Sequence, residues 1–517
     1  MKLRTAIVLL LLPLFSFAQE AEPVGWASLN GGTTGGAGGD TVTVTNRSQF
    51  TFYVSSTQPY VILVQDTISL QLYERVRVTG NKTILGLGHN ATLLYGGLEI
   101  KGDNVIIRNI RITGSYDGDW DGKTHSTDAI TIYSKNVWID HCDLSASADG
   151  LLDIRADGAN AADYVTISWT RLSNHNKVML FGAGDDEIAN RGHLRVTLHH
   201  CWFDGYPGRG LNQRMPRIRF GDVHVYNTFY DEIDSYCIAA RFESDVVVEN
   251  NFFRNSRYPH NIEDQGLGLE NPDLVATGNI YEFTSGAKLT GGVAFNPSDF
   301  YPYSLDDPNL LPGMVMNGAG LFNDPNNQYP TAQNDHVTLE LGTSQTLTIN
   351  PLNNDIDPDG DDLRIAAILN TPSGVARLLH NEIRYTTPLD QNEPDTIVYQ
   401  LVDTQGGTDT ALVIISFGMT TDVNDHTIAE NALRISPNPL KDNALIEYVP
   451  LGFGAVRVQV FDVTGQSVNA SIQSLNANSQ KGLLQFSLEV SHLPVGIYFV
   501  KIQEGNQLIT SRILVIK

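Results

Sequence analysis

A short β-rich segment recurs seven times in the first half of the chain, and this repeat restricts the possible folds more than any other feature. Each copy begins with a polar residue and continues with mainly β-branched residues, as in Asn104-Val-Ile-Ile107 and Asp245-Val-Val-Val248. Copies start 22 to 32 residues apart, at Lys82, Asn104, Asn136, Tyr164, Arg195, Asp222 and Asp245. Coils of a parallel β-helix have this spacing, because each turn adds one strand to a stacked sheet.

The repeat predicts an all-β protein whose main domain is a right-handed parallel β-helix. A β-propeller is the main alternative, but each of its blades needs about 40 residues. Asn residues follow several of the strands, as in Asn250-Asn251. Stacked Asn side chains can bond backbone groups at buried turns, which also favours the β-helix.

The chain is strongly acidic, with 58 Asp and Glu against 34 Lys and Arg and a net charge of −24. Such a surface repels polyanions at long range, which argues against a nucleic-acid partner. A polyanionic substrate would need local positive charge or a bound metal at its site. With 517 residues, the chain is also too long for one ordinary core, so two to four domains are expected.

Residues 1–18 have the pattern of a signal peptide. Lys2 and Arg4 precede an apolar run of about ten residues, and Ser16-Phe-Ala18 is a small-residue cleavage signal before Gln19. A membrane anchor is the alternative, but this run is too short to span a bilayer. We therefore expect a secreted protein with no membrane span.

Only three cysteines occur, at Cys142, Cys201 and Cys237. An odd and small number argues against a disulfide framework, although one pair is possible. We expect all three to be buried packing residues.

The composition and strand pattern of the sequence change after the repeats, and these changes define the expected domain order. We expect the β-helix over 19–322, a linker over 323–335, a small β-sandwich over 336–417, a second linker over 418–435 and another compact β-sandwich over 436–517. In the last domain, strands are expected over 444–448, 456–463, 496–502 and 508–516.

Acidic and basic residues recur in neighbouring repeats of the expected β-helix, namely Asp128, Asp149, Asp153, Lys177, Arg214 and Arg219. Because each coil adds one layer, these side chains can line one cleft across successive layers. Carboxylates are the ligands that Ca²⁺ prefers, and Lys and Arg bind carboxylate groups of a ligand. The set therefore suits a site for an acidic substrate.

Each of these residues also has an ordinary structural interpretation. Asp149 precedes Gly and, taken alone, is better explained as a turn residue. Asp128 can be a turn residue or a ligand, whereas Asp153 lies in a strand, where an inward carboxylate needs a partner. Lys177 alone is typical of solvated surface. Arg214 and Arg219 can form a surface pair, although the Pro between them indicates a rigid turn.

Two pairs of neighbours contain His and might suggest other sites, namely Asp140-His141 and His199-His200. Adjacent residues on a strand point to opposite faces. We therefore interpret His141 as a packing or supporting residue, and we expect no metal site at His199 and His200.

As a set, the strings around these residues resemble the pectate lyases of polysaccharide lyase family 1, in order and spacing. The resemblance covers roughly residues 24–315, including the glycine-rich segment from Gly25 to Gly39. It rests on Asp128-Ala-Ile, Val137-Trp-Ile-Asp-His141, Asp149-Gly-Leu-Leu-Asp-Ile154, Val165-Thr-Ile-Ser-Trp169, Lys177-Val-Met-Leu and Arg214-x-Pro-x-x-Arg219.

The resemblance implies a calcium-dependent pectate lyase that cleaves polygalacturonate or pectin by β-elimination. It implies that Ca²⁺ is bound by Asp128, Asp149 and Asp153. It assigns the general base to Arg214, helped at alkaline pH by bound metal and neighbouring cations. Lys177 would bind the substrate carboxylate, and Arg219 would support substrate binding. We expect the enzyme to act as a monomer.

One position departs from the family pattern. Many members carry a further Asp two residues before the position of Asp128, where this chain has Ser126. This difference implies weaker calcium binding, or calcium binding chiefly together with substrate carboxylates.

Three alternatives remain open from the residues. A pectin lyase acting on methyl-esterified substrate would lack the calcium carboxylates. A hydrolase on a similar β-helix would use paired Asp residues as acid and base, without the Lys177 and Arg214 set. A non-catalytic polysaccharide-binding β-helix would have the cleft without needing Arg214.

The two C-terminal segments resemble modules of secreted proteins. Residues 336–417 resemble cadherin-like or bacterial Ig-like modules, with an acidic stretch at Asp355, Asp357, Asp359, Asp361 and Asp362 that we interpret as an acidic turn more than a calcium site. Residues 436–517 resemble the C-terminal sorting domain of the type IX secretion system. The supporting strings are Ile435-Ser-Pro-Asn-Pro439, Val460-Phe-Asp-Val-Thr-Gly465 and Leu493-Pro-Val-Gly-Ile-Tyr-Phe-Val-Lys501. This resemblance implies the type IX secretion machinery as a partner and export across the outer membrane.

Overall fold

A computed structural model gives the structure of the chain, in two compact units over residues 1–419 and 420–517. The predicted signal peptide and most of the second predicted linker lie outside the described residues. The structure describes 20–119, 124–263, 270–340, 345–370, 372–388, 393–418, 433–438, 440–450, 456–463, 465–475, 484–504 and 507–515.

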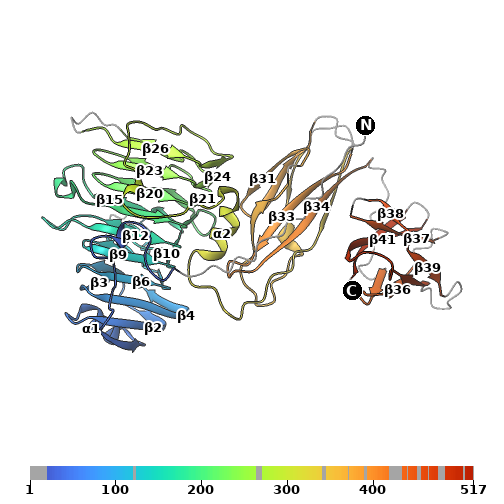
Figure 1. Cartoon of the computed structure of the whole chain (residues 1–517), viewed down its shortest axis with the longest axis horizontal. Coiled ribbons are helices and arrows are strands. Elements are labelled where there is room, and N and C mark those ends of the chain that lie inside the picture. Colours follow the sequence, from blue (N-terminus) through green and yellow to red (C-terminus); the bar gives the residue numbers. More distant parts are fainter. Residues whose placement is uncertain are drawn as a thin grey trace. The chain divides into compact units, whose positions relative to one another are not determined.

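The first unit begins with a parallel β-helix, which confirms the predicted fold class (Figure 1). One coil illustrates the plan: β8 (Ile130–Ile132), β9 (Lys135–Asp140) and β10 (Asp143–Ser145) follow one another, and β11 (Leu152–Ile154) starts the next coil above β8. The three strands of a coil each pair in parallel with the equivalent strands of the neighbouring coils.

The seven repeats of the sequence are the second strands of successive coils. They pair in parallel in chain order, as β4 (Lys82–Leu94), β6 (Val105–Arg108), β9, β12 (Asp163–Ser168), β16 (Val196–His199), β20 (Asp222–Tyr226) and β23 (Asp245–Glu249). The parallel stacking of these strands, which the repeat predicted, is therefore confirmed.

The core is a set of aliphatic ladders inside the coils. On the second strands, one fully buried ladder runs through Ile107, Ile139, Ile167, Leu198, Val225 and Val248, paired in register from coil to coil. Burying one such side chain contributes about 1.5–3 kcal/mol, and β-branched residues fit this pleated surface well. The three cysteines are free and buried, as predicted.

A single left-handed residue joins the second and third strands of each coil and overturns one expectation from the sequence. His141 and His200 occupy this turn with φ of 47° and 51°. A positive φ breaks the alternation of faces, so the turn side chain lies on the same outer side as the residue before it. Consequently His141 Nδ1 bonds Asp140 Oδ2 at 2.8 Å, and His200 Nδ1 lies 2.9 Å from His199 Nδ1. The predicted opposite orientation of these neighbours is wrong.

Asn residues at and beside the same turn form the predicted stack. Asn250 donates from Nδ2 to Asn227 Oδ1 of the preceding coil at 2.8 Å. Asn251 accepts from the Thr228 backbone N–H at 2.9 Å and donates to the Val225 carbonyl at 3.0 Å. These bonds satisfy backbone groups that the tight turn would otherwise leave unpaired.

The first strands of the coils form a separate eight-stranded sheet that carries the candidate site. Its order is β3 (Arg75–Val78), β5 (Gly97–Ile100), β8, β11, β15 (Met179–Phe181), β19 (Arg217–Ile218), β22 (Ile238–Ala240) and β25 (His260–Ile262). On its inner side, Ile132, Ile154, Phe181 and Ile218 stack in register and are buried.

The third strands carry a sandwich domain of two short sheets. One sheet has the order β28 (Asp335–Glu340), β34 (Thr408–Gly418), β33 (Asp395–Val402) and β30 (Arg364–Ile368), and the other β29 (Thr346–Ile349), β32 (Glu382–Thr386) and β31 (Val375–Leu379). The short helix α2 (Leu311–Gly318) lies in an apolar cluster with Trp202, Phe229 and Phe252 of the β-helix and Ala366 and Val402 of the sandwich.

Buried charged residues also contribute to the contact between the β-helix and the sandwich. Arg254, on the third strand β24 (Phe252–Arg254), pairs with Asp231 at 2.7 Å and also donates to the Ala366 carbonyl of the sandwich at 2.7 Å. Arg364 of the sandwich lies 3.6 Å from Asp204 of the β-helix. Both members of each pair are almost fully buried, so the sandwich is fixed to the β-helix through specific contacts.

The second unit is a sandwich of two four-stranded sheets. They have the orders β35 (Leu433–Ser436), β36 (Asn443–Tyr448), β40 (Leu484–Glu489), β39 (Ser471–Ser474), and β38 (Ser467–Val468), β37 (Val456–Asp462), β41 (Gly496–Glu504), β42 (Gln507–Val515). The four strands predicted here are all present.

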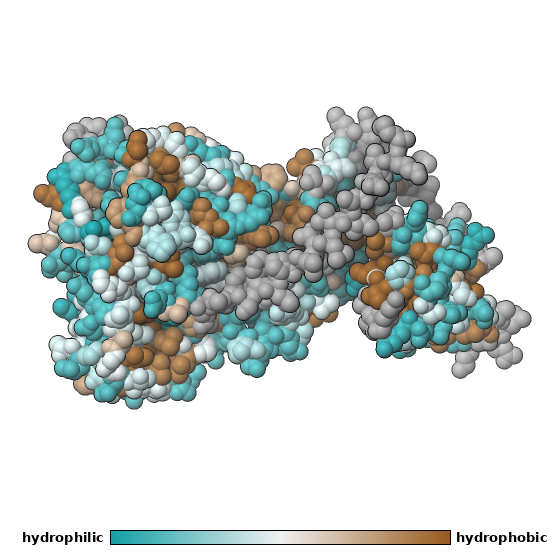
Figure 2. Space-filling view, in the orientation of Figure 1, coloured by the Kyte–Doolittle hydropathy of each residue, from teal (hydrophilic) through white to brown (hydrophobic). Residues whose placement is uncertain are grey.

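The surface is mainly polar. On the face shown in Figure 2, hydrophilic residues cover most of the β-helix, and hydrophobic patches between them are small. Among the described residues, no helix has the length and apolar character needed to cross a membrane.

The junction between β-helix and sandwich generates a first prediction. Arg254→Ala should lower the free energy of unfolding by about 3–5 kcal/mol, because it leaves the Asp231 carboxylate buried without its partner. Thermal or denaturant unfolding measures this change. Arg257→Ala, at an exposed position three residues away, is the matched control and should change stability by less than about 0.5 kcal/mol. Equal effects of the two substitutions would contradict a structural role for Arg254.

Candidate active site

The site lies on the outer side of the eight-stranded first sheet, beside the loops that enter it. Asp153 stands on β11 in register with Thr131 of β8 and Leu180 of β15. Asp128 and Asp149 precede β8 and β11 on the loops that arrive from the third strands. Stacking therefore brings three carboxylates together from two neighbouring coils.

Asp128 and Asp153 are buried, and their environments oppose ionisation. Burial raises the pKa of Asp128 to about 6, although Thr131 Oγ1 donates to Oδ2 at 2.7 Å and the Gly150 N–H donates to Oδ1 at 2.8 Å. Burial, followed by the nearby charge of Asp128, raises the pKa of Asp153 well above its usual value. Two buried carboxylates this close need a cation to remain charged together.

Gly150 lies between these two carboxylates and leaves room beside them. A Cβ at this position would lie 3.0 Å from Asp128 Oδ1 and 3.2 Å from Asp153 Oδ1. Any other residue would press on both oxygen atoms. The glycine thus maintains a small cradle with two carboxylate oxygens on its walls.

Cationic residues face the carboxylates across a pocket of about 150 Å³. The pocket is lined by Asp149, Gly150, Asp153, Arg155, Lys177, Met179, Leu180, Ala183 and Arg214. Burial raises the pKa of Asp149, whereas the positive charges of Lys177 and Arg214 oppose that shift. The acidic half of the pocket thus faces a basic half.

Lys177 and Arg214 reach the pocket from a two-stranded sheet beside the first one. Lys177 ends β14 (His175–Lys177), and Arg214 follows β18 (Leu211–Gln213), whose Gln213 pairs with Lys177. Arg214 has a φ of 67°, and its Nε is buried with no hydrogen-bond partner among the described residues. Arg214 therefore lines the pocket with an Nε–H group that has no acceptor among the described residues.

Arg155 also lines the pocket, and the sequence reasoning missed it. It lies two residues after Asp153 and therefore on the same side of the chain, which is the signal that could have identified it. Its Nη2 donates to the Tyr133 hydroxyl at 2.9 Å. Burial opposes its charge, but Asp153 and neighbouring groups raise its pKa above the usual range.

Arg219 is not among the residues that line this pocket. It is buried and donates to the Gly182 carbonyl at 3.0 Å and to the Asp185 carboxylate. Arg241 also bonds Asp185, at 3.0 Å, and belongs to a charge network behind the site. Four of the six predicted side chains thus line the pocket, Asp128 lies beside it at Gly150, and Arg219 belongs to the supporting network.

A larger cavity of about 400 Å³ lies on the other side of the Tyr133–Arg155 contact. Its lining includes Lys101, Lys135 and His193 together with Asp103 and Asp157. Lys101 and Asp157 already pair at 2.9 Å. Because two of its charged residues already pair with each other, the smaller pocket, which gathers four of the predicted residues, is the better candidate for chemistry.

The fold and the pocket define a class of protein: a parallel β-helix with a small pocket on its first sheet that is lined by both carboxylates and cations. A family profile described as pectate lyase matches residues 1–307 of the chain. Further profiles match a bacterial Ig domain over 327–416 and a secretion system C-terminal sorting domain over 434–517.

Known relatives agree with these matches. A pectate trisaccharide-lyase of Bacillus licheniformis is 33% identical over 326 residues, covering 60% of this chain and 88% of the relative. The pectate lyase plyB of Emericella nidulans is 36% identical over 312 residues, covering 59% and 86%. The chain belongs to the pectate lyase family.

Several solved structures are similar to this chain. One is the crystal structure of Bsp165PelA from Bacillus sp. N165 in complex with trigalacturonate, with 27% identity and a TM-score of 0.49. The match covers 58% of this chain and 98% of that structure.

The cradle at Gly150 generates a second prediction. Gly150→Ala should weaken Ca²⁺ binding by about tenfold without unfolding the protein, because the new methyl group displaces Asp128 and Asp153. Titration calorimetry with Ca²⁺ measures the affinity. Gly496→Ala is the control, since a Cβ there meets no atom closer than 3.7 Å. Unchanged calcium affinity in Gly150→Ala would remove these two carboxylates from the metal site.

Proposed function

We propose that this protein is a secreted pectate lyase that cleaves α-1,4-linked polygalacturonate by calcium-assisted β-elimination, yielding 4,5-unsaturated oligogalacturonates. Membership of the family supports lyase activity on this class of polymer. The observation that carries the proposal is the single pocket in which Asp149 and Asp153 face Lys177 and Arg214. Binding an acidic sugar and removing a proton beside its carboxylate require both halves.

The three carboxylates would move closer together to share one calcium ion, since among the described residues their oxygen atoms do not all lie within 4.8 Å of one another. Ca²⁺ takes oxygen ligands, and Asp128, Asp149 and Asp153 supply them around the cradle at Gly150. In the proposal these three residues hold the ion, and the exposed Ser126 adds no further carboxylate. When bound, the ion would neutralise the uronate carboxylate and make the neighbouring C5 proton more acidic.

The cationic residues would perform the remaining steps. Lys177 binds the uronate carboxylate as a point charge and orients the sugar ring. Arg214 takes the proton from C5, the C5–H electrons form the C4–C5 double bond, and the C4–O bond to the leaving sugar breaks. A guanidinium is normally protonated, so this role needs alkaline pH and the positive field of Lys177 and Arg155. Arg219 supports substrate binding from the network behind the pocket.

The C-terminal unit supports a proposal about location. Its match to a secretion system sorting domain favours export through the type IX machinery. Together with the predicted signal peptide, this match supports a location outside the cell or at its surface. A polymer too large to enter a cell requires an enzyme in that location.

A third prediction tests the reaction class. Incubation of the mature protein with polygalacturonate and Ca²⁺ should increase the ultraviolet absorbance of unsaturated uronate, and a chelator should abolish the increase. New reducing ends without absorbance would indicate hydrolysis. Turnover of methyl-esterified pectin alone would favour a pectin lyase, and binding without cleavage a polysaccharide-binding protein.

A fourth prediction tests the base. Arg214→Lys should lower kcat by at least about 100-fold with little change in substrate affinity, because general-base catalysis contributes about 10²–10⁴-fold. Arg257→Lys, at an exposed position outside the pocket, is the matched control and should leave kcat unchanged. Near-normal turnover of Arg214→Lys would remove Arg214 from this role.

A further inference from the structure

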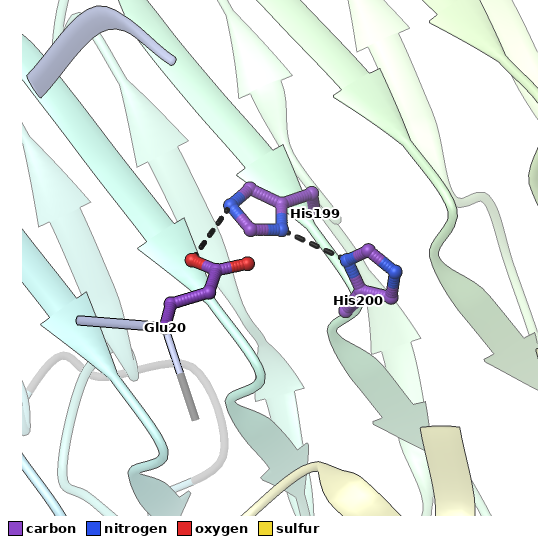
Figure 3. A group of neighbouring side chains, drawn as sticks. All are labelled: Glu20, His199 and His200. Atoms are coloured by element: carbon purple, nitrogen blue, oxygen red, sulfur yellow. Dashed lines mark hydrogen bonds and ion pairs between the residues drawn. The ribbon is translucent and has the colours of Figure 1, made fainter. Parts of the chain in front are cut away.

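A cluster of potential metal ligands lies on the outer side of the second strands of the coils. The pocket, in contrast, lies on the sheet that the first strands form. One carboxylate oxygen of Glu20 and one ring nitrogen each of His199 and His200 lie within 4.8 Å of one another (Figure 3). His199 is fully buried, His200 is nearly so, and the Glu20 side chain is 21% exposed. Both imidazoles lie beside the carboxylate of the N-terminal segment.

The hydrogen bonds around this cluster leave electron pairs facing each other. His200 Nε2 lies 2.7 Å from an Asp306 carboxylate oxygen, which only accepts, so Nε2 carries a proton, and when the ring is neutral its Nδ1 has a lone pair. His199 Nδ1 lies 2.9 Å from that lone pair. If His199 donates there, its Nε2 becomes an acceptor that faces Glu20 Oε2 at 3.8 Å.

The alternative tautomer places the conflict at a different pair of atoms. If His199 carries its proton on Nε2, the two Nδ1 lone pairs face each other at 2.9 Å. Glu20 Oε2 and His199 Nε2 are buried and have no hydrogen-bond partner among the described residues. Unpaired buried polar atoms are costly. A metal ion bound by the Glu20 carboxylate and by one nitrogen of each imidazole would give these groups a partner, with the two Nδ1 atoms moving slightly apart.

We propose that Glu20, His199 and His200 form a binding site for a transition-metal ion of the zinc type. Two imidazole nitrogens and one carboxylate suit Zn²⁺ or its neighbours, whereas Ca²⁺ prefers oxygen ligands alone. A tetrahedral zinc with bonds of about 2.1 Å separates its ligands by about 3.4 Å, so ligand atoms that lie within 4.8 Å of one another need to approach by at most about 1.4 Å.

The surroundings have the features of a supported metal site. Asp306 holds the second nitrogen of His200, the arrangement that orients metal-bound imidazoles in proteins. Trp169 stacks on His200 with ring centroids 4.2 Å apart, and Tyr226 stacks on His199 at 5.0 Å. These rings shield the cluster from water and fix both imidazole planes.

The site would attach the N-terminal segment to the β-helix. Arg108 donates to the Glu20 carbonyl at 2.9 Å, and the Trp26 backbone N–H donates to Thr197 Oγ1 at 3.0 Å. A metal bound by Glu20 and His199 would join two segments 179 residues apart in sequence. Such a link stabilises the folded state, because binding occurs only when the segment is docked.

The experiment uses the full chain after signal-peptide removal, without a polyhistidine tag, stripped of metal by a chelator. Excess Ca²⁺ is kept in all samples so that the carboxylate-only groups are occupied. Zn²⁺ at a free concentration about 100-fold above Kd should raise the thermal midpoint by roughly 3–8 °C. Co²⁺ should give a visible absorption band typical of low-symmetry coordination by nitrogen and oxygen.

Two variants make the test specific. Glu20→Gln and His200→Gln should each reduce Zn²⁺ affinity at least tenfold and weaken the Co²⁺ band, while His336→Gln, at an exposed position, should change neither. Glu20 is partly exposed, so its variant should fold even if the His200 variant does not. The proposal is overturned if Zn²⁺ does not bind, if binding survives both substitutions, or if stability follows pH but not metal. Lyase activity does not enter these measurements, so the result is independent of the proposed function.

Discussion

In-register stacking of the coils is the constraint on which the rest of this structure depends. Each aliphatic side chain in the core packs on its equivalent above and below, as in the ladder from Ile107 to Val248. A shift of one residue in any coil would turn that ladder outward and expose it to water. The same register therefore fixes the position of every outward side chain, including those of the pocket and those on the second strands.

The pocket shows how this register assembles charge. Asp153 projects from a strand, Asp128 accepts the Gly150 N–H of the next coil, and Lys177 and Arg214 come from two further coils. Groups that are distant in sequence thus share a small volume, where burial opposes ionisation of the acids. Carboxylates and cations thus line one small volume of a strongly acidic protein, and the proposed binding of an acidic polymer depends on this local balance of charge.

Other outward faces are covered by parts of the same chain. The N-terminal segment lies on the second strands, and the sandwich with α2 lies on the third strands. Buried ion pairs such as Arg254–Asp231 hold their geometry only because both sides are desolvated together. The first sheet keeps its pocket between the neighbouring loops, which is consistent with its assignment as the working surface.

The sequence by itself determined the repeat period, the parallel stacking of the strands and four of the five charged residues that line the pocket. It could do so because β-branched spacing and acid–base content are local properties of the chain. Only the tertiary structure decided that Arg155 joins the pocket and that Arg219 pairs with Asp185 behind it. It also decided that His199 and His200 lie on one side, since the sign of one φ angle reverses the alternation that strand periodicity predicts. The coils above and below decide which charged side chains pair with each other and whether a turn residue adopts a positive φ. No single segment of the sequence contains that information.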